Sequence, residues 1–163
     1  MSDFTEAVQT KCLDFSDRII KLNDYLLAQA AKAHDDYKKS LSPRKRGQSS
    51  KISPLSSASV PVFLQSVSAL CNQLLRSGTS IGANNAEAVN AISKQDYRSK
   101  SFIALKEARE SLYWIDLLHR NKYITEEQYA SIYADCEELV KLLVVRCKKI
   151  NEELDNKGKS SKS

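Results

Sequence analysis

Apolar residues recur at spacings of three and four along most of this 163-residue chain. That period places them on one face of an α-helix. The first stripe is sustained for nearly four heptads, and it consists of Phe4, Val8, Cys12, Phe15, Ile19, Leu22, Leu26 and Ala30. It predicts a long amphipathic helix at the start of the chain.

The pattern is lost from about His34 to Pro61, where serine, lysine, arginine and three prolines dominate. A connection of this length is unusual inside a compact domain. We therefore expect a long basic connection over about 34–61 that is either disordered or ordered by a partner. A second helix is expected to begin at Val62.

Three more stripes follow, each with helical spacing. They consist of Phe63, Val67, Leu70, Leu74, Ile81, Asn85 and Ala88; of Phe102, Leu105, Ala108, Leu112, Ile115 and Leu118; and of Tyr129, Ile132, Cys136, Leu139, Leu143, Arg146 and Ile150. Ser93 is a good N-cap for the third helix, and Thr125 with Gln128 predicts a capping box for the fourth.

Short connections make helices two, three and four antiparallel neighbours. The predicted fold class is all-α, an antiparallel up-down-up-down four-helix bundle. One domain is expected over 1–154, followed by a polar disordered tail over 155–163.

Small residues replace large ones in the second helix, where each glycine costs about 1 kcal/mol of helix propensity. Such a stretch predicts close packing, against another helix or against a second subunit. This oligomer or helix-packing seam consists of Arg76, Ser77, Gly78, Ser80, Ile81, Gly82, Asn84, Glu87 and Arg109. Within it, Glu87 is expected to pair with Arg109 across helices two and three. The alternative is that Arg76 reaches RNA or a neighbouring subunit.

The formal net charge of +5 is unevenly placed, with its excess in the long connection and the C-terminal segment. Basic patches of this kind bind phosphates without reading sequence. The candidate nucleic-acid-binding residues are Lys38, Lys39, Arg44, Lys45, Arg46, Lys51, Arg146, Lys148 and Lys149. The alternatives are a solvated, flexible insertion and, for the last three residues, a complement to the helix dipole.

Candidate chemistry is sparse. The four cysteines are far apart and three fall on apolar stripes, which indicates buried small side chains. His34 and His119 have no acidic or histidine neighbours at metal-ligand spacing, so we expect no metal, no cofactor and no catalytic residues. No apolar run is long enough to span a membrane and no signal-peptide pattern is present, so we expect a cytoplasmic protein.

Three segments carry a family resemblance: QLLRSGTSIGANNAEA over Gln73–Ala88, SKQDY over Ser93–Tyr97 and IALKEARESLYW over Ile103–Trp114. Together they resemble the bacterial four helix bundle protein family, named for members encoded in intervening sequences of large-subunit ribosomal RNA. The match extends over about Val62 to Ile150. The family is related in fold to the accessory variability determinant of diversity-generating retroelements.

The resemblance implies a ring-like homopentamer without enzymatic activity. It also implies a scaffold that binds structured RNA, a reverse transcriptase, or both, as an accessory subunit of a retroelement-like ribonucleoprotein. The long basic connection departs from the family pattern, in which this connection is short. The alternative function is a structural or protein-interaction oligomer that does not bind nucleic acid.

Overall fold

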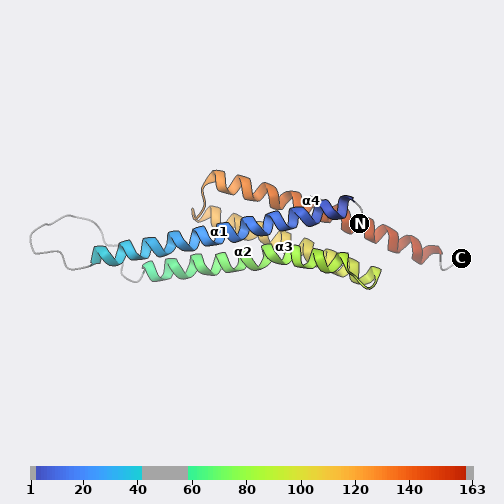
Figure 1. Cartoon of the computed structure of the whole chain (residues 1–163), viewed down its shortest axis with the longest axis horizontal. Coiled ribbons are helices and arrows are strands. Elements are labelled where there is room, and N and C mark those ends of the chain that lie inside the picture. The colour runs from blue at the N-terminus through green and yellow to red at the C-terminus, as the bar shows by residue number, and fades with distance from the viewer. Residues whose placement is uncertain (1–2, 42–58, 161–163) are drawn as a thin grey trace, which may run out of the picture.

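The computed structural model describes residues 3–41 and 59–160, and they form four helices (Figure 1). These are α1 (Asp3–Leu41), α2 (Ser59–Val89), α3 (Lys94–Arg120) and α4 (Glu126–Ser160). The helices alternate in direction along an elongated bundle, and the end of α4 projects beyond the others. The predicted all-α, up-down-up-down four-helix bundle is confirmed.

Each helix packs against its neighbours in sequence, and α1 also contacts α4. Polar side chains join these two helices: Lys11 Nζ donates to Glu138 Oε2 at 2.8 Å, and Arg18 bonds both Asp135 and Ser131. The bundle is thereby closed between its first and last helices.

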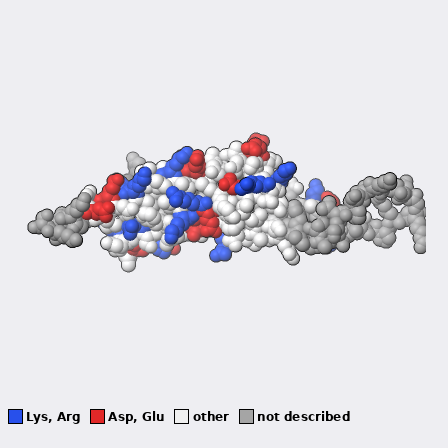
Figure 2. Space-filling view, turned by 180° about the vertical axis from the view of Figure 1, so that it is seen from behind, with Lys and Arg blue, Asp and Glu red and all other residues white. Residues whose placement is uncertain are grey.

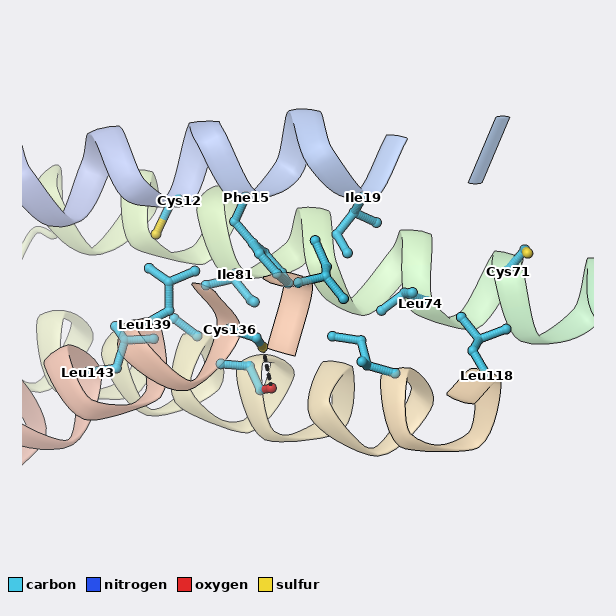
Figure 3. Packing of buried hydrophobic residues seen from close by; sticks show 14 of the residues in the cluster. Cys12, Phe15, Ile19, Cys71, Leu74, Ile81, Leu118, Cys136, Leu139 and Leu143 are labelled. Atoms are coloured by element: carbon cyan, nitrogen blue, oxygen red, sulfur yellow. Dashed lines mark hydrogen bonds between the residues drawn. The ribbon is translucent and has the colours of Figure 1, made fainter. Parts of the chain in front are cut away.

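The core forms where the apolar stripes of all four helices meet (Figure 3). Its largest fully buried side chains include Phe15, Ile19, Ile81, Ile115 and Leu139. Burial of apolar surface at about 25 cal/mol per Å² is the main force that holds such a bundle together. Most residues of the predicted stripes are buried, but Phe4 is 40% exposed. Five others are half-buried, namely Leu22, Leu70, Phe102, Leu112 and Tyr129, and the side chain of Phe63 lies outside the described residues.

The helix ends differ from the sequence-based expectation. The first helix continues past His34 to Leu41, so the connection begins at residue 42. The second begins at Ser59, because a proline is tolerated in the first turn of a helix, where the missing N–H has no acceptor to lose. The fourth helix extends to Ser160, through most of the segment expected to be a disordered tail.

The predicted caps are present. Ser93 Oγ accepts a hydrogen bond from Asp96 N at 3.0 Å, at the start of α3. At the start of α4, Gln128 N donates to Thr125 Oγ1 and Thr125 N donates to Gln128 Oε1, at 3.2 and 2.9 Å. These bonds satisfy backbone donors that a helix start leaves without partners.

Part of the small-residue seam packs inside the bundle, whereas its charged members Arg76, Glu87 and Arg109 are exposed. A Cβ added at Gly78 would lie 3.0 Å from Ile19 Cγ1, so α1 and α2 are in close contact there. On the side that faces α3, the buried Ser111 Oγ donates to Ser77 Oγ at 2.9 Å. Of the two interpretations of this stretch, helix packing accounts for Ser77, Gly78 and the fully buried Ile81.

The expected ion pair between Glu87 and Arg109 is wrong. Glu87 forms its salt bridge with Lys100 of α3, about two and a half turns before the expected partner Arg109. Arg109 and Arg76 are both exposed. Arg76 nevertheless interacts with Glu107 of α3. Burial and the neighbouring Glu110 raise the pKa of Glu107, and the positive charge of Arg76 opposes this rise.

Candidate nucleic-acid interface

The basic residues proposed from sequence are distributed over several places. Lys38 and Lys39 lie in the last turn of α1 and are exposed, with Lys39 Nζ at 3.9 Å from Asp36 Oδ1. A basic last turn complements the helix dipole. Four further candidates lie outside the described residues, namely Arg44, Lys45, Arg46 and Lys51.

The three candidates on α4 do not share a surface. Arg146 is buried, with only 3% of its surface exposed, so it does not present its charge to a nucleic-acid backbone at the surface. Lys148 and Lys149 are both exposed, but they line different hollows. Only Lys148 is placed beside basic residues of α3.

The hollow that Lys148 lines lies between α3 and α4, and we call it the α3–α4 groove. It has a volume of about 350 Å³ and is lined by Phe102, Leu105, Lys106, Arg109, Val144, Cys147, Lys148 and Asn151. Lys106 and Arg109 are three residues apart, so they project from one face of α3. Lys148 reaches the same groove from the antiparallel α4. Among these described lining residues there is no carboxylate.

Arg98 joins α3 to α4 at one end of the α3–α4 groove. Its Nε donates to Asn151 Oδ1 at 2.7 Å, which ties α3 to α4. Its guanidinium carbon lies 5.3 Å from the centre of the Phe102 ring, a cation–π distance. A fourth positive charge is thus held at the mouth of the groove.

The packing beneath the groove explains its shape. Ala104 and Ala108 are fully buried on the inner face of α3, and their small side chains let α4 approach. The buried Cys136 Sγ donates to the Ala108 backbone oxygen at 3.3 Å, which marks this close approach (Figure 3). The longer Lys106 and Arg109 side chains then stand along the edge of the helix contact.

Elsewhere the surface carries both signs of charge. Figure 2 shows lysine and arginine intermixed with aspartate and glutamate over the face that it displays. Salt bridges join Lys141 to Glu137 and Lys94 to Glu153 on the surface. The α3–α4 groove differs from these mixed regions, because its described lining carries cations and no carboxylate.

Lys106 and Arg98 were missed by the sequence analysis, and Arg109 was assigned to the seam. A signal was present, because Lys106 and Arg109 share a helical face and α4 runs antiparallel beside it. The sequence does not specify how α3 and α4 are rotated relative to each other. This rotation places Lys148, and not Lys149, beside Lys106 and Arg109.

Other candidate chemistry fits a structural role. All four cysteines are buried and unpaired, and burial raises the pKa of Cys71 to about 11 and that of Cys136 to about 12. These thiols stay protonated near neutral pH and are poor nucleophiles and metal ligands.

His119 stacks on Tyr129 with ring centres 4.1 Å apart and bonds Glu126. Within the described residues, no three potential metal ligands come together.

No helix in the described part of the chain combines the length and apolar character needed to cross a bilayer.

Comparison with known proteins gives a family. The chain is similar to a crystallised protein from Bacteroides thetaiotaomicron VPI-5482, described as a protein with unknown function from the S23 ribosomal protein family. The two are 36% identical, the alignment covers 89% of this chain and 98% of the other, and the TM-score is 0.65. A comparison with curated proteins gave no match. Residues 58–145, which span α2, α3 and half of α4, match the 23S rRNA-intervening sequence protein family. The chain belongs to this family.

Proposed function

We propose that this protein is a non-enzymatic RNA-binding scaffold that holds an RNA backbone along the α3–α4 groove. The observation that carries the proposal is the convergence of Lys106, Arg109 and Lys148 on one groove whose described lining contains no carboxylate. The family description, which refers to 23S rRNA, is in keeping with an RNA-related role.

The proposed mechanism is electrostatic. Cations that neutralise phosphates release counterions, so affinity falls steeply with salt, with a logarithmic slope of about −0.7 per phosphate on single strands. Phe102 adds an aromatic surface at the end of the groove. Lys38 and Lys39, in the last turn of α1, lie toward the opposite end of the bundle from the groove, so they would contact a separate stretch of the RNA backbone through charge alone.

Assembly would multiply these weak contacts. On α1, Leu13 and Ile20 are 58% and 42% exposed and lie one heptad apart, so one face of this helix offers apolar side chains to a second copy. A homopentamer, as the family resemblance implies, would repeat the groove around a ring. Several linked sites bind one RNA far more tightly than any single site does.

A reverse transcriptase is the protein partner that the resemblance suggests, in a retroelement-like ribonucleoprotein in the cytoplasm. In such a particle the bundle would position the template RNA. Strand synthesis would belong to the partner.

Purification of a tagged chain from its native host at low and at high salt tests this function. The expected result is a defined RNA that co-purifies at low salt and is released as salt rises, with any bound protein identified by mass spectrometry. A clean oligomer that is free of nucleic acid at low salt would overturn the RNA-binding proposal.

The second candidate is a structural or protein-interaction oligomer that does not bind nucleic acid. The exposed apolar face of α1 favours it, because this face needs a partner whether or not RNA is present. Replacing Arg44, Lys45, Arg46 and Lys51 with serine separates the two candidates. The RNA-binding proposal expects weaker RNA binding with assembly intact, and the alternative expects no change in either.

A further inference from the structure

Arg146 is a charged residue in the interior of the bundle. Its Nη1 donates to Asn85 Oδ1 on α2, and Asn85 Nδ2 in turn donates to Gln9 Oε1 on α1. Three helices therefore meet at one guanidinium, which is charged at any physiological pH. Asn85 is fully buried and, through these two bonds, holds Arg146 in place.

Two other nitrogen atoms of the Arg146 guanidinium, Nε and Nη2, do not take part in these hydrogen bonds. Within the described part of the chain, Nε and Nη2 are buried and have no hydrogen-bond partner. In a guanidinium these two N–H groups lie on the same edge and point in parallel. That edge matches the two oxygens of a carboxylate and binds them in bidentate fashion.

The chain supplies no described counter-ion for this charge. Glu153 lines the same hollow, but its Oε2 lies 3.1 Å from Lys94 Nζ. Cys12 is near enough for Arg146 to lower its pKa, yet burial raises that pKa to about 11, so the thiol is neutral. A buried charge without a partner is unfavourable, which is a reason to look for a ligand.

A hollow of about 470 Å³ opens over Arg146 between α1, α3 and α4. Its walls are largely apolar or aromatic, with Phe4, Tyr97, Val145 and Ile150 around the basic Arg146 and Lys149. The Phe4 ring centre lies 5.8 Å from the Arg146 guanidinium carbon. This combination of size, apolar walls and a few polar groups is typical of a small-molecule site.

We propose that this hollow binds a small organic monocarboxylate with an apolar body. The carboxylate would take the Nε and Nη2 edge of Arg146. Because these two atoms are buried in this structure, binding would displace the Phe4 ring that lies over the guanidinium. Lys149 would add a second positive charge, and the apolar body would lie against Val145 and Ile150. A phosphate suits the site less well, because it has no apolar part and carries more negative charge toward Glu153. This site is separate from the α3–α4 groove, so its test is independent of RNA binding.

Isothermal titration calorimetry with phenylacetate tests the proposal, with phenylacetamide and inorganic phosphate as matched probes. Phenylacetate is expected to bind at least about tenfold more tightly than either, since hydrogen bonds between charged groups are worth about a factor of ten or more. Equal binding of the neutral amide, equal binding of phosphate, or no binding of phenylacetate would each overturn it.

Variants locate the site. Arg146→Gln should abolish phenylacetate binding, and Lys149→Ala should weaken it several-fold, whereas the neighbouring Lys148→Ala should not change it. Should Arg146→Gln fail to fold by circular dichroism, Val145→Asp gives the same test. Val145 is 58% exposed and lines the hollow, so an aspartate there should be tolerated and should repel the carboxylate. Unchanged binding by Lys149→Ala and Val145→Asp would contradict the proposed location.

Discussion

At Gly78 and Gly82 the backbone of α2 approaches α1, and the two positions differ in the room they leave. A Cβ at Gly78 would meet Ile19 Cγ1 at 3.0 Å, and Ile19 is fully buried. A Cβ at Gly82 would lie 3.5 Å from Ser16 Oγ and 3.6 Å from Cys12 Cβ, which are ordinary contacts. Only the first glycine is required by packing.

Alanine substitutions should therefore have opposite effects. Gly82→Ala gains helix propensity and should raise the free energy of unfolding by about 0.5–1 kcal/mol. Gly78→Ala gains the same propensity but overpacks the contact with Ile19, at a cost of about 1–3 kcal/mol, so it should be less stable than wild type. Urea unfolding followed by circular dichroism measures both. A Gly78→Ala variant as stable as Gly82→Ala would show that the contact between α1 and α2 is looser than described.

The buried thiols make stability depend on alkaline pH. Burial raises the pKa of Cys71 to about 11 and that of Cys136 to about 12, above the ordinary thiol value, so the folded state keeps protons that the unfolded state releases. Their contribution is complete below the unfolded pKa and is lost as pH rises through the folded pKa.

We expect the free energy of unfolding to fall from about pH 8.5 upward, by as much as about 1.4 kcal/mol per pH unit for each buried thiol. Urea titrations at pH 7 to 10.5 measure this dependence. Cys136→Ala removes one such group and should reduce the slope, whatever it does to stability at pH 7. An unchanged slope would mean that Cys136 is not protected by burial.

At the scale of the element, helix starts are set by local side chains. Ser93 caps α3 through its bond to Asp96 N, and Thr125 with Gln128 caps α4. Ser93→Ala should lower the free energy of unfolding by about 1 kcal/mol, whereas Ser93→Asp should retain most of it, because an aspartate caps equally well. Chemical denaturation of both variants tests the cap. Equal losses in the two variants would indicate that Ser93 acts through something other than its hydroxyl acceptor.

Helix interiors and the starts of α3 and α4 were predictable because apolar spacing and capping residues are local signals. The polar C-terminal ends of α1 and α4 were not predictable in this way. Residues 35–40 and 155–156 are largely exposed, so no stripe of buried residues marks these parts of the helices. The continuation of the helices to Leu41 and Ser160 therefore left no trace in the apolar pattern.

The candidate sites required contacts between helices, which the sequence does not specify. Arg146 was both a member of an apolar stripe and a candidate for the basic surface, and in the structure it is buried with a hydrogen bond to Asn85 on another helix. Likewise α3 carries several lysines and arginines, and Glu87 pairs with Lys100 among them.

At the scale of the whole molecule, the exposed apolar face of α1 predicts assembly. Leu13→Ser together with Ile20→Ser should lower the mass of the particle measured by light scattering, with the helical circular dichroism spectrum unchanged, because both side chains are outside the core. Lys21→Ser, at an exposed polar position of the same helix, is the control. An unaltered mass in the double variant would place the interface elsewhere.

The central claim is that the α3–α4 groove binds RNA, and fluorescence anisotropy with a labelled RNA at increasing salt tests it most directly. The account predicts that a Lys106→Glu, Arg109→Glu, Lys148→Glu variant loses at least about a hundredfold in affinity and that its salt dependence is flatter, because three phosphate contacts are lost. Lys21→Glu on α1, a helix that contributes no residue to the described lining of the groove, should bind as wild type does. Equal affinity and equal salt slope in the triple variant and the wild type would contradict the account.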